Sequence, residues 1–216
     1  MARGDNDGQS AADILVVVRD RSGKVPERVV MDYVRPSVNV SPTISWYGRD
    51  RLQNMFRSGH LFAWHLSRES RALWGPADIQ ELFGEPAPYQ DALLDISSFQ
   101  TIIEGIPAAL RSCPRNAVYE MGLLYVCVRN IAMSASWHLC DAPDFTRYSP
   151  FNFKSRQFCA SRADYELAMA CRMASQRGLR MFDPGTFDRV LALQEPLILW
   201  SEGLQKDVQA DAKQRG

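Results

Sequence analysis

The sequence has few of the residues from which metal sites and disulfide frameworks are built. It contains 3 histidines and 5 cysteines in 216 residues, and no Cys-x-x-Cys pair. The odd number and wide spacing of the cysteines argue against a disulfide framework, and the scarcity of histidine argues against a zinc site. Cys127, within an apolar run, is typical of a small buried residue in a reducing compartment. His60 and His65 do not share a helix face, so we expect packing or capping roles for them.

An excess of charge of one sign and long apolar runs are also missing. Lys and Arg number 25 and Asp and Glu number 25, so the formal net charge is zero. We therefore expect no bulk attraction to nucleic acid or to an anionic membrane. No stretch approaches the roughly 20 apolar residues that span a bilayer, and residues 1–7 lack the apolar core of a signal peptide. With 46% hydrophobic residues, the sequence predicts a folded cytoplasmic protein without membrane or nucleic-acid partners.

The pattern of the sequence changes near Gly84 and predicts an α/β domain over 1–84 and a helical domain over 85–216. In the first domain, the continuous β-branched run 14–18 predicts a buried central strand of a small sheet. The alternating segment 38–47 predicts a second strand. Three short amphipathic stretches then predict helices over 51–57, 61–66 and 78–82.

Segment 26–35 is open to two interpretations. Its apolar residues at 29, 30, 33 and 34 fit one face of a helix, and Pro26 suits a first helical turn. Its β-branched residues favour a strand instead. The helix is slightly favoured, and the choice decides on which kind of element Asp32 lies.

The second domain is predicted to be almost entirely helical, with Asn116 and Ser161 as N-caps and Gly178 as a C-terminal stop. Its four predicted helices cover Gln90–Arg111, Asn116–Leu139, Arg162–Arg177 and Thr186–Lys206. We expect Pro196 to kink or split the last helix and residues 209–216 to fray. The predicted fold class is therefore α+β: a small mixed sheet with flanking helices, followed by an antiparallel four-helix bundle.

The connection 141–151 is long for a bundle and rich in aromatic residues, and such loops are often functional or face a partner. Basic residues in and after it are interleaved with aromatic ones; they are Arg147, Lys154, Arg156 and Arg162, among Tyr148, Phe151, Phe153 and Phe158. This pattern could bind a phosphate or stack on a base. Because the net charge is zero, packing of the aromatic side chains onto the bundle is the favoured interpretation.

Three segments carry a resemblance to a known family: Ala2-Arg3-Gly4-Asp5-Asn6-Asp7-Gly8-Gln9-Ser10-Ala11-Ala12-Asp13 before strand 14–18, then 45–52, then 58–75. Together, over about residues 2–75, they resemble a bacterial minimal nucleotidyltransferase domain of the DNA polymerase β-type superfamily, which a helical domain often follows. In that family a Gly-Ser turn cradles the nucleotide phosphates. Asp-x-Asp at the head of a strand and a third carboxylate on a neighbouring strand hold two Mg²⁺ ions.

The resemblance assigns roles to particular residues of this chain. It implies Asp13 and Asp32 as catalytic metal ligands for Mg²⁺, and Gly4 and Ser10 as contacts of the nucleoside triphosphate. In some relatives a glutamate of the helical domain is the general base for the acceptor hydroxyl, which would be Glu120 here. The favoured interpretation of Glu120 is simpler, because a carboxylate in a first helical turn complements the helix dipole.

The sequence departs from the family pattern at the metal site. Ala11 stands where the first aspartate of Asp-x-Asp is expected, and the Gly-Ser pair is absent from its expected place. A strand over 26–35 would supply Asp32 as the third carboxylate, whereas a helix moves that position to near Thr43 or Ser45. A lost metal ligand costs several kcal/mol of transition-state stabilisation.

We therefore predict a degenerate nucleotidyltransferase-like pseudoenzyme that acts as a binding or interaction module for a protein partner or a second copy. The alternative is an active Mg²⁺-dependent nucleotidyltransferase. Such an enzyme would move a nucleoside monophosphate from a nucleoside triphosphate to a hydroxyl group of a protein, a small molecule or RNA.

Overall fold

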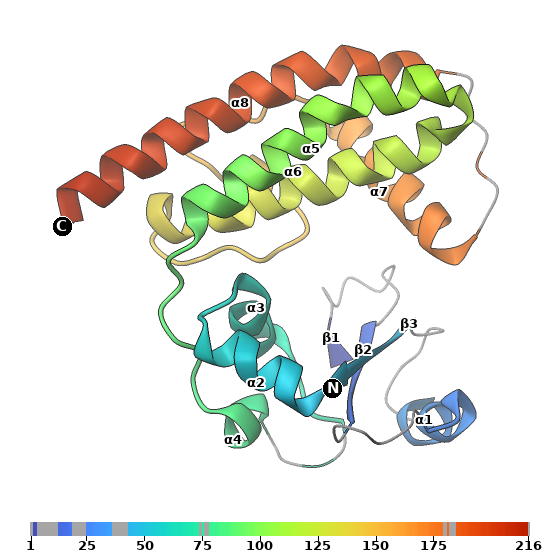
Figure 1. Cartoon of the computed structure of the whole chain (residues 1–216), viewed down its shortest axis with the longest axis vertical. Coiled ribbons are helices and arrows are strands. Elements are labelled where there is room, and N and C mark those ends of the chain that lie inside the picture. The colour runs from blue at the N-terminus through green and yellow to red at the C-terminus, as the bar shows by residue number, and fades with distance from the viewer. Residues whose placement is uncertain are drawn as a thin grey trace. The chain divides into compact units, whose positions relative to one another are not determined.

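The computed structural model describes residues 2–3, 13–18, 25–35, 43–73, 75, 78–178, 181 and 185–215. The chain forms two compact units, residues 1–90 and residues 91–216, and both are drawn in Figure 1. Most of the described residues are helical, and a small sheet lies in the first unit. The α+β class is therefore confirmed. Among the described helices, none is both long enough and apolar enough to cross a membrane.

Three short strands form the sheet of the first unit, in the order β1-β2-β3. β1 (Ala2–Arg3) is antiparallel to β2 (Asp13–Val18), and β2 is parallel to β3 (Thr43–Gly48). The sheet is thus mixed, and β2 is its central strand, as the β-branched run predicts. Ile14 and Leu15 point to opposite faces of β2 and are both buried.

The connection between the two parallel strands contains α1 (Glu27–Val34), so the helical interpretation of segment 26–35 is confirmed and the strand alternative is wrong. Pro26 precedes the helix at its N-cap position, and Glu27 lies in the first turn. β-branched residues cost only a few tenths of a kcal/mol each in a helix. That cost is small beside the burial of Val34 on the inner side of the helix.

Three helices follow β3: α2 (Arg49–Arg57), α3 (Leu61–Glu69) and α4 (Ile79–Phe83). Each is found where the sequence predicts a helix, with ends that differ by at most three residues. They bury an apolar core together with β2; its members are Leu15, Leu52, Phe56, Ala63, Leu66, Ile79 and Phe83.

Residues 85–90 belong to the first unit because they pack onto its helices. The Ala87 N–H donates to the Phe56 carbonyl at 2.8 Å, and the Trp64 indole N–H donates to the Ala87 carbonyl at 2.8 Å. Gly59 has φ of +68°, and a Cβ there would collide with the carbonyl of Pro88. Only glycine fits at position 59, where the chain passes close to the backbone of Pro88. The division into units accordingly falls after Gln90, later than the predicted position.

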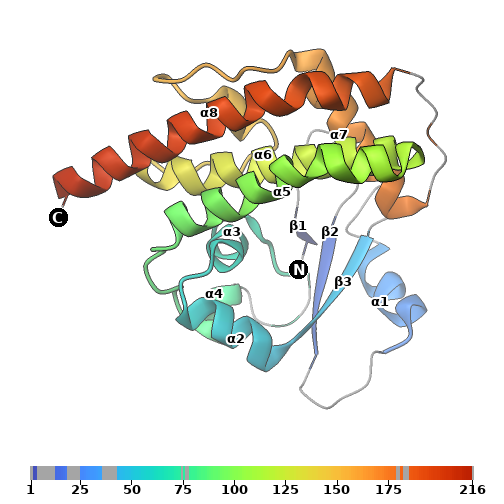
Figure 2. The same cartoon turned by 45° about the horizontal axis from the view of Figure 1, so that its top comes forward.

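The second unit consists of four long helices with two short 3-10 turns. The helices are α5 (Ala92–Ser112), α6 (Ala117–Leu139), α7 (Arg162–Arg177) and α8 (Thr186–Arg215), and the turns are η2 (Pro114–Asn116) and η3 (Ser149–Phe151). α6 packs against the other three helices, and α5 also packs against α8. α5 and α6 run in opposite directions, and α8 runs in the direction of α6 (Figures 1 and 2). α7 crosses them steeply in both views.

α8 departs from its prediction, because it is one helix of 30 residues. Pro196 does not split it: the residue is exposed, so the carbonyl of Ala192 that loses its helical hydrogen bond is open to water. The polar end, predicted to fray, is helical to Arg215. Val208 is fully buried and Asp211 pairs with His138 at 3.0 Å, which fixes this end to α6.

The predicted ends of α7 are confirmed. The Ser161 hydroxyl accepts a hydrogen bond from the Asp164 N–H at 3.1 Å, and Gly178 ends the helix with φ of +62°. Asn116 is at the N-cap position of α6, but its side chain makes no capping hydrogen bond.

Candidate functional site

The residues assigned to the nucleotide site begin at the head of β2. Gly4, Ser10 and Ala11 lie outside the described residues. Asp13 is the first residue of β2 and pairs with Thr43 of β3, and two residues later Leu15 pairs with Ser45. Thr43 and Ser45 are thus the β3 positions that pair with Asp13 and with the residue two places after it. Neither residue carries a carboxylate.

Asp32 is not placed as a third metal ligand requires. It lies on the helix α1, and its side chain is exposed. The strand on which its assignment depended does not form. The equivalent position then falls at Thr43 or Ser45, whose uncharged oxygens bind Mg²⁺ far more weakly than a carboxylate does. Among the described residues of β1, β2 and β3, Asp13 is the one carboxylate, and a single carboxylate does not hold two Mg²⁺ ions.

Glu120 lies in the first turn of α6, in the second unit, and its side chain is only 4% exposed. Burial raises the pKa of its carboxyl group above the ordinary value. In the described part of the chain it has no ion-pair partner, so the helix N-terminus is its main source of compensation. Glu120 is thus in the position that the helix-dipole interpretation expects, and it is more deeply buried than that role requires.

No metal-binding cluster accompanies these residues: within the described ranges, no three His, Cys, Asp or Glu side chains gather closely enough to hold a metal ion. The five cysteines are all free thiols. Burial, and then the nearby Glu120 carboxylate, raise the pKa of Cys127 to about 12. A thiol that stays protonated at neutral pH is a packing group and a poor nucleophile.

Both histidines of the first unit have structural roles. The His60 Nδ1 atom accepts from the Phe62 N–H at 3.0 Å and so caps α3, which confirms the capping prediction. His65 is buried, with its Nδ1 atom 3.4 Å from Glu69 one turn later on the same helix.

The most elaborate arrangement of side chains surrounds the connection between α6 and α7, residues 140–161, which we call the connecting segment. Side chains and backbone groups fix it to the helices at several points. The Asp144 N–H donates to the Ser136 hydroxyl at 2.9 Å, and the Asp144 carboxylate accepts from the Thr146 N–H at 2.8 Å and from the Asn152 amide at 2.7 Å. This irregular chain is therefore held in one conformation.

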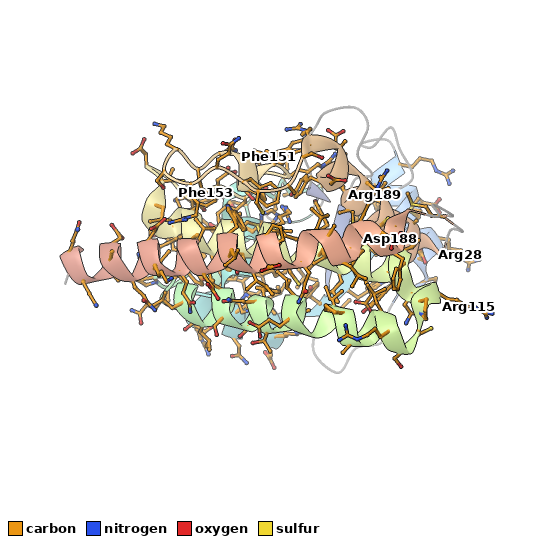
Figure 3. The ribbon with its side chains drawn as sticks, turned by 90° about the horizontal axis from the view of Figure 1, so that it is seen from above. Arg28, Arg115, Phe151, Phe153, Asp188 and Arg189 are labelled. Carbon is orange, nitrogen blue, oxygen red and sulfur yellow. The ribbon has the colours of Figure 1, made fainter. Side chains whose placement is uncertain are left out.

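Aromatic rings of the connecting segment pack onto the helices. The ring centroid of Phe158 lies 4.9 Å from that of Trp200 on α8 and 5.7 Å from that of Tyr165 on α7. Phe151 and Phe153 belong to the same cluster, and Figure 3 labels both where the segment passes beside α8. The prediction that these aromatic side chains pack onto the helices is confirmed.

The basic residues of this region have mostly found structural partners. Arg156 makes a two-pronged ion pair with Asp207 of α8, at 2.9 and 3.1 Å, and its guanidinium lies against Gly203, where any Cβ would collide with it. Arg162 pairs with Glu166 at 2.9 Å and stacks 3.5 Å from the ring centre of Tyr148. These two arginines pin the segment and are not free to bind a ligand.

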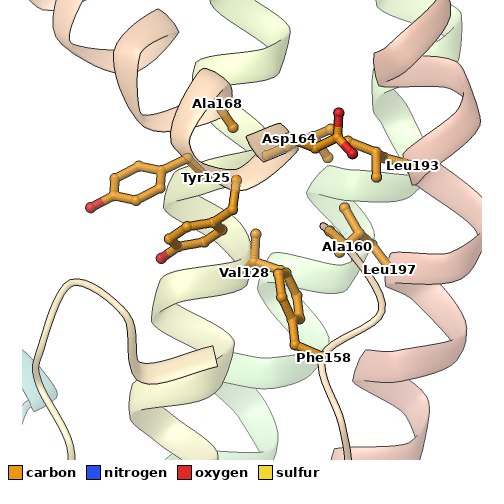
Figure 4. Close-up of a pocket in the computed structure, with 10 residues that line it drawn as sticks. Tyr125, Val128, Phe158, Ala160, Asp164, Ala168, Leu193 and Leu197 are labelled. Atoms are coloured by element: carbon orange, nitrogen blue, oxygen red, sulfur yellow. The ribbon is translucent and has the colours of Figure 1, made fainter. Parts of the chain in front are cut away.

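A small apolar hollow lies between the segment and α6, α7 and α8 (Figure 4). Among the residues that line it are Tyr125, Val128, Phe158, Asp164 and Leu197. It offers only about 10 Å³, which is room for one water molecule at most. The hollow is a packing defect of the core and too small for a substrate.

Arg129 of α6 differs from the other arginines. Its Nη2 group donates to the Phe145 carbonyl at 2.6 Å, which ties the segment to α6. Its Nε–H is buried without a hydrogen-bond partner. Beside it, the Tyr165 hydroxyl donates to the Arg147 carbonyl at 2.6 Å.

Comparisons with known protein families, curated proteins and solved structures found no match.

Sequence reasoning grouped Arg147, Lys154, Arg156 and Arg162 by their spacing along the chain but left out Arg129. The sequence does contain a feature that singles out Arg129, because it is the single Lys or Arg in the apolar stretch 117–139. A cation on an otherwise apolar helix needs a specific partner.

Proposed function

We propose that the chain is a degenerate nucleotidyltransferase-like protein that serves as a binding or interaction module, with a protein or a second copy of itself as the partner. The proposal includes a nucleotidyltransferase-like fold for the first unit, an antiparallel four-helix bundle for the second and a cytoplasmic location. It rests on the resemblance over residues 2–75 together with the departures from the family pattern.

One observation carries the loss of activity: the parallel register of β2 and β3. Asp13 pairs with Thr43, and Leu15 pairs with Ser45, so the paired positions of the neighbouring strand hold hydroxyl-bearing residues where the family pattern has a carboxylate. Asp32 is exposed on α1. With Ala11 before it in the sequence, Asp13 is the single carboxylate among the described residues of the three strands. One carboxylate holds Mg²⁺ too weakly to assemble a two-metal centre for attack on the α-phosphate.

The test is the melting temperature of the full chain with each of the four nucleoside triphosphates, measured in Mg²⁺ and again in EDTA. A ligand at 100 times its dissociation constant stabilises a fold by about 2.7 kcal/mol, which a melting curve resolves. We expect no shift that depends on Mg²⁺. A Mg²⁺-dependent shift that disappears in Asp13→Asn would overturn the proposal and establish the active-enzyme alternative.

A gain-of-function variant makes the same test sharper. Ala11→Asp combined with Ser45→Asp restores a carboxylate at each of the two deficient positions. If the site is degenerate for the reason given, this double variant gains a Mg²⁺-dependent nucleotide shift that the wild type lacks. The matched control is Ala11→Asn with Ser45→Asn, which adds similar volume without charge and should gain nothing.

A further inference from the structure

Arg129 carries a positive charge into the interior of the second unit. It lies near the middle of α6, where its neighbours Val128 and Ile131 are almost fully buried. Its own side chain is part-buried, and the Nε atom is out of contact with solvent. Removing a guanidinium from water is costly unless an opposite charge or a full set of acceptors replaces the water.

The surroundings supply only part of that compensation. One of the five N–H groups of Arg129 is used, by the Phe145 carbonyl. The buried Nε–H has no acceptor. In the described part of the chain no carboxylate forms an ion pair with Arg129. A part-buried cation without an ion pair, with one N–H group orphaned in the interior, calls for an explanation, and a missing counter-ion is the simplest one.

The groups around Arg129 include the Tyr165 hydroxyl and the backbone carbonyls of Phe145 and Arg147. The Tyr165 hydroxyl feels the charges of both Arg129 and Arg147, which oppose the rise in its pKa caused by burial. On α7, the Glu166 carboxylate accepts from Arg162 at 2.9 Å and from the Tyr148 hydroxyl at 3.4 Å. Arg129 and Arg147 thus both lie close enough to Tyr165 to act on its hydroxyl electrostatically.

We propose that Arg129, with the connecting segment closed over it at Phe145 and Arg147, is a binding site for a phosphate group, either free or carried by a small nucleotide. A tetrahedral oxyanion offers several acceptors at once and matches the planar fork of a guanidinium. It would supply both the counter-charge and the acceptor that the Nε–H lacks. This site belongs to the second unit alone and does not depend on the proposed function.

The fixed geometry of the segment supports this assignment. The carbonyls of Phe145 and Arg147 are already occupied by Arg129 and Tyr165, at 2.6 Å each. The site is thus preorganised, and little conformational entropy is lost when an anion binds.

The experiment measures the melting temperature of the full chain in EDTA with inorganic phosphate or AMP, against potassium chloride of the same ionic strength. At about 100 times the dissociation constant we expect the melting temperature to rise by about 5–10 °C. A larger rise with AMP than with phosphate at equal concentration identifies a nucleotide as the carrier. An equal rise means that the phosphate group suffices.

Two variants decide whether the shift comes from this site. Arg129→Met removes the charge and keeps the aliphatic stem, and we expect it to abolish the shift. Arg115→Met is the matched control, because Arg115 is exposed in the turn before α6 (Figure 3) and should keep the full shift. Asp13→Asn should also keep it, which separates this site from any nucleotide site of the first unit.

The melting temperature of the variant without phosphate or AMP shows whether it is folded. Arg129→Met removes an uncompensated charge but also the hydrogen bond to the Phe145 carbonyl, so its melting temperature in chloride should fall only modestly below that of the wild type. If it fails to fold, Arg129→Lys replaces it, with anion affinity expected to fall about tenfold through loss of the planar fork. Equal shifts in the wild type and the Arg129 variants, or no shift in the wild type, would overturn the proposal.

Discussion

The head of β2 and the connecting segment 140–161 both lack regular helical structure, but their neighbours fix them to different degrees. At the head of β2, the strand registers pair Asp13 with Thr43 of β3 and with Arg3 of β1, and these backbone pairings are the neighbours described there. In the connecting segment, backbone carbonyls, ring stacks and an ion pair each have a defined partner on a helix. The first region is therefore a candidate site because of a resemblance in sequence, and the second because of its packing.

The largest expected effect comes from removing the aromatic anchor of the segment. Phe158→Ala should destabilise the second unit by about 3 kcal/mol, because the ring is 7% exposed and its loss leaves a cavity beside Trp200. Chemical denaturation followed by tryptophan fluorescence measures this. Leu199→Ala, on the exposed side of α8, is the control and should cost less than about 0.5 kcal/mol. Equal losses in the two variants would mean that the segment is not anchored.

A smaller effect tests whether the segment depends on the close contact of α6 and α7. A Cβ at Gly122 would lie 2.8 Å from backbone atoms of Arg172, so Gly122→Ala should push the helices apart and cost about 2 kcal/mol. Gly105→Ala on α5 has open space around its Cβ and should stabilise by about 0.5–1 kcal/mol. The two free energies of unfolding should therefore change in opposite directions, and a stabilised Gly122→Ala would contradict the observed packing.

The smallest effect concerns Glu120, the one predicted site residue in the second unit. Its pKa is raised in the folded state by burial, so the folded protein binds this proton more tightly than the unfolded chain does. Stability is then lost as the pH rises from below the ordinary carboxyl value to above the raised one. Glu120→Gln should melt higher than the wild type at pH 7 and show little or no gain at pH 4. A larger gain at pH 4 than at pH 7 would show that Glu120 is stabilised as a carboxylate.

Most helices and strands of this protein follow from local patterns in its sequence. The buried run 14–18 is the central strand, and Ser161 and Gly178 end α7 as predicted. The helix over 27–34 is hard to distinguish from a strand by sequence, because its β-branched residues suit a strand as well. The polar end of α8 was missed because tertiary contacts at Val208 and Asp211, invisible to local pattern, hold it.

The candidate sites were harder to predict. Whether Asp32 faces the head of β2 depends on that one ambiguous helix. The surroundings of Arg129 depend on the path by which residues 145–147 return to α6. The connecting segment has no regular hydrophobic pattern, so the sequence alone does not predict this path. Residues 4–11, on which the phosphate-loop assignment rests, lie outside the described residues.

The ion pair between Arg156 and Asp207 joins positions 51 residues apart in the chain, and this separation has a consequence for biosynthesis. A ribosome completes the connecting segment well before it makes Trp200 and Asp207, which anchor that segment to α8. During synthesis at about 5–20 residues per second, the nascent segment waits for seconds with its aromatic rings uncovered. In this interval the half-made chain offers chaperones a binding site that the finished protein has closed.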